Sequence, residues 1–168
     1  YIHFAEGDKL PSSIPLATTY DNVATVRTFS KVYAMPSMRL GYCVSSQKIQ
    51  REMMKYFTGG TSMLTNVAGT AAVQDIEHIQ RSREVVWAFK NRLYEECEKM
   101  GWEYIPTQGT FVMVNIGTES RKIVSEMRKR NVWISSRRQD EFKNWIRVSA
   151  GTEDETEVFL DTLQQVMS

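Results

Sequence analysis

Cysteine and histidine are scarce in this sequence of 168 residues, which holds two of each. Cys43 and Cys97 make neither a disulfide framework nor a metal-ligand spacing, so we expect two buried free thiols in a reducing compartment, the cytoplasm. His3 and His78 stand apart from any cluster of cysteine or acidic residues, and we assign neither of them a chemical role. The sequence therefore predicts no metal site.

An excess of one charge is also missing, because 21 Lys and Arg face 20 Asp and Glu and leave a net charge of +1. No global field therefore attracts nucleic acid or an anionic membrane. The chain also lacks an apolar run long enough to span a bilayer. Its hydrophobic content of 42% is sufficient for one core of ordinary size or parts of two smaller ones. We expect a globular protein that binds neither nucleic acid nor a membrane.

Hydrophobic periodicity predicts a mixture of strands and helices. This alternation predicts an α/β unit over residues 1–75, followed by a small α+β domain over residues 76–168 that begins with a long connecting helix. The expected elements, in chain order, are a helical turn near 14–20, strands at 23–26 and 40–44, a polar helix near 47–57, a long helical region that stops at Gly101, strands at 102–105 and 111–114, a helix at 119–130, strands at 132–134 and around Arg147, and a last helix that begins with a capping box at Thr152 and Glu155.

Lys31 lies in an unusual segment of the first unit. It directly follows an apolar run, and it precedes Arg39 by eight residues in a stretch that leads into another apolar run. A lysine at the end of a buried strand, beside hydroxyls and a fixed cation, is suited to present a neutral amine for Schiff-base formation. A solvated loop lysine is the alternative interpretation.

The segment around this lysine resembles the lysine motif of fold-type I pyridoxal-phosphate enzymes, in the subgroup typified by histidinol-phosphate aminotransferase. That motif reads roughly T-x-S-K, a short loop, and then G-x-R-x-G, and the matching residues are Thr28, Ser30, Lys31, Arg39 and Gly41. The resemblance implies that Lys31 forms the Schiff base with pyridoxal 5'-phosphate. It also implies that Thr28, Ser30 and Arg39 hold the phosphate of this cofactor. Hydroxyl donors and a planar guanidinium suit that task.

Both ends of the chain extend the resemblance. Tyr1 corresponds to the last residue of the family's D-x-A-Y strand end, whose tyrosine hydroxyl meets the phenolic oxygen of the cofactor. Arg147 begins a segment similar to the family's R-V-S-x-G-T, whose arginine binds the α-carboxylate of the substrate. Because Arg147 alternates with Ile146 and Val148, an exposed charge on an edge strand is the alternative interpretation.

The resemblance implies that the chain is the C-terminal half of such an enzyme, with residues 1–75 as the C-terminal part of the cofactor-binding large domain and residues 76–168 as the small domain. It also implies parts of the site that would precede Tyr1. These are an aspartate for the ring nitrogen, an aromatic residue that stacks on the ring, an asparagine for the phenolic oxygen, and a helix N-terminus for the phosphate. We therefore expect the sequence to be an excerpt, a processed product or one piece of a split protein, with an incomplete site. Relatives of this fold usually form homodimers, so we expect a homodimer.

The activity that the resemblance implies is transamination between a 2-oxo acid and an amino donor, either an amino acid or an amino-alcohol phosphate. Two departures weaken the case for histidinol phosphate. Ser135 and Ser136 stand where relatives carry an arginine for the substrate phosphate, and Gln108 to Thr110 lack the usual asparagine. Arg137 and Arg138 either replace that arginine or are surface charges.

Two other functions remain open. The segment from Tyr33 to Pro36 also resembles the lysine loop of threonine-phosphate decarboxylase, and the same electron sink would release carbon dioxide from a differently held substrate. The second is a catalytically silent domain that serves in binding or assembly, since a fold does not impose an activity.

Ser37 stands in place of the first glycine of the lysine motif and requires a tolerable backbone conformation there.

Overall fold

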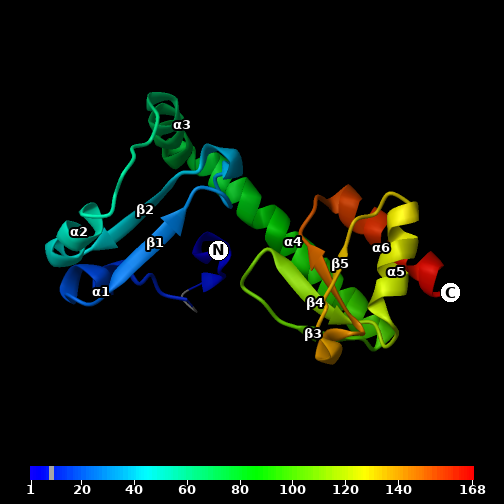
Figure 1. Cartoon of the computed structure of the whole chain (residues 1–168). Helices are drawn as coiled ribbons and strands as arrows, with labels where there is room; N and C mark the ends of the chain where they lie inside the picture. Colours follow the sequence, from blue (N-terminus) through cyan, green and yellow to red (C-terminus); the bar gives the residue numbers. More distant parts are fainter. Residues whose placement is uncertain (8–9) are drawn as a thin grey trace. The chain divides into compact units, whose positions relative to one another are not determined.

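The computed structural model describes residues 1–7 and 10–168 of the chain. The chain forms two compact units, Tyr1–Arg81 and Ser82–Ser168. Helix α4 (Ile76–Met100) is continuous across the boundary between them (Figure 1). The sequence places this boundary six residues earlier, between 75 and 76, at the start of the same helix.

The first unit contains a two-stranded antiparallel sheet, in which Thr28 of the first strand lies opposite Gly41 of the second. The predicted helical turn near 14–20 and the predicted strands at 23–26 and 40–44 are present, each with ends within two residues of the prediction. The polar helix stops at Met54 instead of continuing to 57. The elements of this unit are η1 (Ile2–Phe4), α1 (Ile14–Thr19), β1 (Ala24–Thr28), η3 (Pro36–Met38), β2 (Gly41–Ser45), α2 (Gln47–Met54), α3 (Met63–Gln74) and residues 76–81 of α4.

The long helical region that the sequence predicts is divided into two helices at Asp75. Asp75 leaves the helical conformation, with φ −81° and ψ 75°, and ends α3. Its side-chain Oδ1 then accepts a hydrogen bond of 2.9 Å from the backbone N–H of His78. A short acidic side chain can satisfy a free N–H in the first turn of a helix, so Asp75 ends one helix and caps the next.

The expectation that Lys31 follows a buried strand is wrong for this unit. In β1 only Thr25 is buried, and Val26 is 70% exposed. The described sheet of this unit has two antiparallel strands, and together with the helices of the unit it agrees with the mixed α/β fold that the sequence predicts. Two strands alone offer little to cover both faces of an apolar run.

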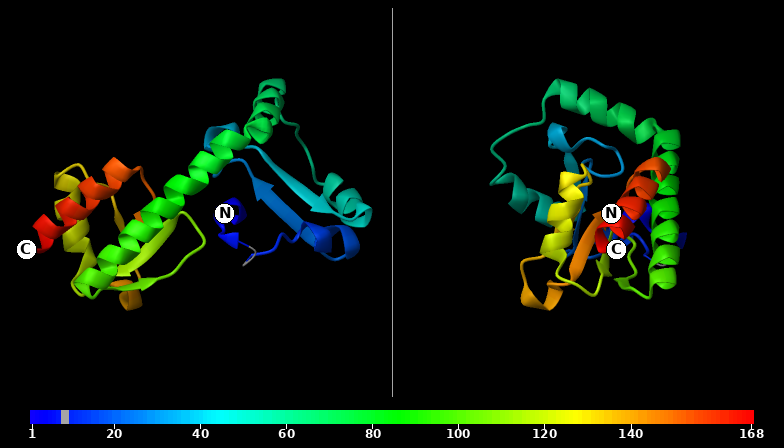
Figure 2. Two further views of the ribbon diagram at one scale, coloured as in Figure 1. Left: turned by 180° about the vertical axis from the view of Figure 1, so that it is seen from behind. Right: turned by 90° about the vertical axis from the view of Figure 1, so that its right-hand side faces the viewer.

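The second unit packs helices on one face of a four-stranded antiparallel sheet with the order β3-β4-β6-β5 (Figure 2). Alternate residues of the two inner strands, such as Val112 and Val148, are buried against α4, α5 and α6 and form one hydrophobic core with them. The elements are β3 (Glu103–Ile105), β4 (Phe111–Asn115), α5 (Ser120–Lys129), β5 (Ser135–Ser136), η4 (Asp140–Phe142), β6 (Trp145–Ser149) and α6 (Glu153–Met167).

The strand that the sequence predicts at 132–134 is absent from this position, and β5 occupies Ser135–Ser136 instead. Asn131 adopts a left-handed conformation with φ 62°, and the N–H of Val132 donates to the carbonyl oxygen of Met127 at 3.0 Å. This pattern closes the C-terminal end of α5. The apolar residues Val132 and Ile134 therefore pack on the core from a helix end, which their composition alone could not distinguish from a strand.

Two predicted helix ends are confirmed. Gly101 has φ 66°, and the N–H of Trp102 donates to the carbonyl oxygen of Cys97 at 2.9 Å, which ends α4. At the start of α6, Thr152 and Glu155 form the reciprocal capping box. Both ends fix helices that cover the sheet of the second unit.

Both cysteines are free, as expected. Cys97 is buried in the core, and burial raises the pKa of its thiol to about 12, so it remains protonated at neutral pH. Cys43 is half-buried in β2. Within the described ranges, no helix combines the length and the hydropathy needed to cross a membrane.

Candidate functional site

Lys31 lies at the start of the connection between β1 and β2. The N–H of Phe29 donates to the carbonyl oxygen of Leu40 at 3.0 Å, directly beyond the last strand pair. The N–H of Met35 returns to the carbonyl oxygen of Phe29 at 3.1 Å, and the N–H of Ala34 donates to the carbonyl oxygen of Lys31 at 2.8 Å. These three bonds close the base of the loop and fold it back onto itself.

Buried side chains on both sides of Lys31 anchor this loop. Phe29 is 6% exposed and Val32 is 2% exposed, whereas Lys31 is exposed. The ring of Phe29 also stacks on Tyr33, with centroids 4.6 Å apart. Packing therefore holds the backbone on either side of the lysine while its amine remains accessible.

Three of the other predicted site residues surround this lysine. Thr28 Oγ1 donates to Ser30 Oγ at 3.0 Å and accepts from the backbone N–H of Ser30 at 3.1 Å. The Nζ atom of Lys31 lies 5.3 Å from the centroid of the Tyr1 ring. Tyr1, Thr28 and Lys31 also line a small cavity of about 70 Å³. The structure thus brings Tyr1, Thr28, Ser30 and Lys31 together at the end of β1.

Arg39 lies at the far end of the same loop, in an unusual backbone conformation. Its φ is 50° and its ψ is 42°, which is the left-handed region that non-glycine residues rarely adopt. Its NH1 donates to the carbonyl oxygen of Pro36 at 2.9 Å. The remaining donors of the guanidinium are suited to another acceptor. Ser37 does not have a positive φ, so its replacement of glycine leaves the backbone unstrained there.

Gly41 has a steric reason to be glycine. A Cβ atom at this position would lie 2.7 Å from the backbone carbonyl oxygen of Arg27 on β1. This distance is too short for a side chain, so only glycine allows β2 to pair closely beside the strand that leads to Lys31.

His78 holds the lysine loop, although the sequence gives it no role. Its Nε2 lies 3.0 Å from the carbonyl oxygen of Val32. Because a carbonyl oxygen only accepts, Nε2 carries the hydrogen in this contact. The two residues are 46 positions apart, so no local pattern could have predicted their contact.

Arg147 belongs to the second unit, on an interior strand. It lies on β6, opposite Met113 of β4 and Ser135 of β5, so the alternative of an edge-strand charge is wrong. The guanidinium carbon lies 4.0 Å from the centroid of the Phe111 ring, and NH1 donates to Ser149 Oγ at 3.1 Å. Arg147 is half-buried and held by contacts on two sides.

Arg137 and Arg138 are exposed and follow β5. They line a shallow cavity of about 200 Å³ with Arg121, Asp140 and Lys143, among other residues. This placement agrees with the interpretation as surface charges. Among the described residues, no three His, Cys, Asp or Glu side chains gather as metal ligands would.

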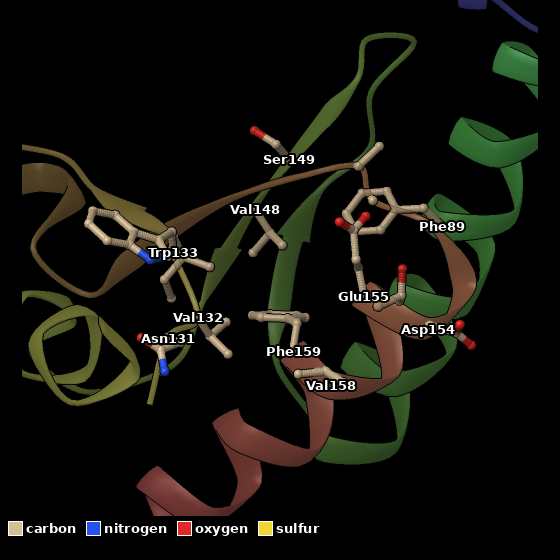
Figure 3. Close-up of a pocket in the computed structure, with 14 residues that line it drawn as sticks. Phe89, Asn131, Val132, Trp133, Val148, Ser149, Asp154, Glu155, Val158 and Phe159 are labelled. Atoms are coloured by element: carbon tan, nitrogen blue, oxygen red, sulfur yellow. The ribbon is translucent and has the colours of Figure 1, made fainter. Parts of the chain in front are cut away.

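A further cavity of about 490 Å³ lies in the second unit between the end of β6, the start of α6 and the segment 131–134 (Figure 3). Its floor is apolar and includes Phe89, Val148 and Phe159, while Trp133 and Asp154 lie at its rim. None of the site residues predicted from the sequence lines this cavity.

Comparison with known proteins identifies the family. The family model described as aminotransferase class I and II matches residues 1–163. A histidinol-phosphate aminotransferase of Halalkalibacterium halodurans is 29% identical over 169 residues, which cover 100% of this chain and 46% of that protein. The enzyme of the same name from Moorella thermoacetica is 29% identical over 170 residues, covering 100% of this chain and 44% of that protein.

Solved structures agree with this result. A structure from Erwinia carotovora atroseptica superposes with a TM-score of 0.90 at 27% identity, covering 99% of this chain and 49% of that one. Histidinol-phosphate aminotransferase from Sinorhizobium meliloti, in complex with pyridoxal-5'-phosphate, superposes with a TM-score of 0.84 at 24% identity and covers 99% and 47%. The chain spans about half the length of the relatives that it matches. It belongs to the class I and II aminotransferase family.

Proposed function

We propose that this chain supplies the lysine of a pyridoxal 5'-phosphate-dependent aminotransferase, with Lys31 as the residue that binds the cofactor covalently. The observation that carries this proposal is the accessible amine of Lys31 on a packed loop, beside the paired hydroxyls of Thr28 and Ser30. A lysine held in this way meets two requirements of a covalent anchor, a fixed backbone and a free amine.

The donor set around this lysine fits the proposed cofactor. Thr28 and Ser30 offer two hydroxyls within 3.0 Å of each other, and Arg39 offers a planar cation, which together suit a phosphate group. The Nζ of Lys31, an exposed residue, suits an aldehyde carbon, and it lies 5.3 Å from the centroid of the Tyr1 ring. When bound, pyridoxal 5'-phosphate withdraws electrons from the Cα of an amino substrate and so weakens the bonds to that atom.

The roles of the protein residues follow from their chemistry. We propose that Arg147 binds the substrate α-carboxylate through its free in-plane donors, since a guanidinium matches a carboxylate bidentately. The freed amine of Lys31 would take the proton from the substrate Cα as a general base. Together these roles describe transamination between an amino acid or amino-alcohol phosphate and a 2-oxo acid. The amino-group transfer in the family description supports this reaction class.

We also propose that the protein is a cytoplasmic homodimer. The segment from α2 to α4 carries apolar side chains that are largely exposed, including Tyr56 at 82%, Met63 at 80% and Leu64 at 77%. Exposed apolar groups gathered over one segment favour association with another protein surface. Sedimentation equilibrium of the complete protein would give a mass twice that of one polypeptide.

An amino-donor screen with 2-oxo acid acceptors tests the reaction. We expect the wild-type protein to convert an amino donor to its oxo acid, and K31A to lose this activity by several orders of magnitude. K48A is the matched control, because Lys48 is an exposed lysine on α2 of the same unit. Release of carbon dioxide from the donor in place of oxo-acid formation would contradict transamination and support the decarboxylase alternative.

A further inference from the structure

Phe111 and Arg147 lie on the sheet face that points away from the helices of the second unit. Strand residues alternate between the two faces, and the alternate residues Val112 and Val148 are buried against the helices. Phe111 lies directly opposite Ser149, which follows Arg147 by two positions and shares its face. These three side chains therefore form a small cluster on one face.

The contacts within this cluster restrain the guanidinium in two ways. The central carbon of the guanidinium lies over the ring of Phe111, 4.0 Å from the ring centroid. Ser149 Oγ accepts one of its N–H groups at 3.1 Å. The donors of a guanidinium lie in its plane, so a ring packed over the central carbon restrains the group without using any of them. At least four of the five N–H donors are then left for an anion in that plane.

The backbone that carries Phe111 is itself held in place. In the connection between β3 and β4, the N–H of Thr107 donates to Tyr94 Oη at 3.0 Å, and Lys90 Nζ lies 3.5 Å from the Thr107 carbonyl oxygen. Lys90 is 1% exposed. Immediately before Phe111, the carbonyl oxygen of Thr110 accepts from the N–H of Ala150 at 2.9 Å. Helix α4 and the end of β6 thus fix the segment from which the ring projects.

We propose that Phe111 is a positioning residue, which holds the plane of the Arg147 guanidinium so that the carboxylate of an amino substrate meets two donors at once. This inference rests on the proposed carboxylate-binding role of Arg147. A free arginine side chain loses rotamer freedom when it binds an anion, and the ring removes part of that freedom in advance. The affinity for a carboxylate should therefore depend on the aromatic ring as well as on the charge.

The test is a titration of the complete protein with sodium propionate, followed through the Nε–Hε signal of Arg147 in protein labelled with ¹⁵N-arginine. R147K identifies the signal by its loss. We expect propionate to shift this signal in the wild type. In F111L we expect the signal to lose its ring-current shift and the dissociation constant for propionate to rise roughly five- to thirtyfold. F111Y keeps the ring and should retain the wild-type constant.

The matched control is F142L, which removes a phenylalanine ring of the same unit that packs on Trp145. It should leave the Arg147 signal and the propionate constant unchanged. Equal constants in wild type and F111L would overturn the positioning role of Phe111. A wild-type Arg147 signal that propionate does not perturb would instead overturn the proposed carboxylate site, so the two failures are distinguishable. In steady-state kinetics with the best donor of the screen, F111L should raise KM more than it lowers kcat.

Discussion

The Nε2 atom of His78 lies 3.0 Å from the carbonyl oxygen of Val32 and joins the first turn of α4 to the residue that follows Lys31. We expect H78F to leave this buried carbonyl without its partner and to destabilise the lysine loop by about 1–2 kcal/mol. Hydrogen exchange of the backbone amides between residues 29 and 35 should then be roughly tenfold faster than in the wild type. H78Q retains a side-chain donor and should recover part of the protection. Unchanged exchange in H78F would show that packing alone holds the loop.

The close pairing at Gly41 gives a second prediction. G41A places a Cβ atom 2.7 Å from the carbonyl oxygen of Arg27, and a backbone atom cannot move away cheaply. We expect a loss of about 1–3 kcal/mol in the free energy of unfolding, measured by urea denaturation. G60A is the control, because nothing lies within 4 Å of a Cβ atom at Gly60. If both variants had the wild-type stability, the contact between β1 and β2 would be looser than the structure indicates.

The buried carboxylate of Glu96 makes the free energy of unfolding depend on pH. Arg92 NH1 lies 2.9 Å from Glu96 Oε2, and Gln164 Nε2 donates to Glu96 Oε1 at 2.8 Å. The hydrogen bond from Arg92 holds the pKa of the Glu96 carboxyl below its ordinary value. A depressed pKa in the folded state stabilises the protein above the unfolded pKa of about 4.3, and this contribution is lost as the pH falls through the folded value.

We therefore expect the free energy of unfolding to decrease from pH 5 to pH 3 more steeply in the wild type than in E96Q, whose amide does not titrate. At pH 7, E96Q should be less stable by roughly 1–3 kcal/mol, because Arg92 loses a charged partner. Urea denaturation at pH 7, 5, 4 and 3 measures both effects. Parallel curves for the two proteins across this range would contradict the role given to Glu96.

Local patterns predicted the elements whose signals are themselves local. The stop at Gly101 and the capping box at Thr152 depend on residues within a few positions of each other, and both are present. The segment 132–134 does not form a strand, because the left-handed conformation of Asn131 closes the end of α5 and its apolar residues follow directly after that helix end. The hydrophobic pattern of three residues cannot distinguish a short strand from an apolar segment that follows a helix end.

The candidate site also combines features set by neighbouring residues with contacts between residues far apart in the sequence. A local motif contains Thr28, Ser30 and Lys31, and the hydrogen bonds of Thr28 and Ser30 span two residues. The contacts of His78 with Val32 and of Phe111 with Arg147 join residues far apart in the sequence. Only the folded backbone brings these pairs together, so the sequence could not predict these contacts, whereas the roles proposed for Thr28, Ser30 and Lys31 come from the local motif.

The central claim is that Lys31 binds pyridoxal 5'-phosphate covalently, and reduction with borohydride tests it most directly. The complete protein is mixed with the cofactor, reduced, digested and examined by mass spectrometry. We predict a phosphopyridoxyl group on the peptide that contains Lys31, which is lost in K31R and retained in K48A. A wild-type protein with no adduct on this peptide, or with the adduct only on another lysine, would contradict the account.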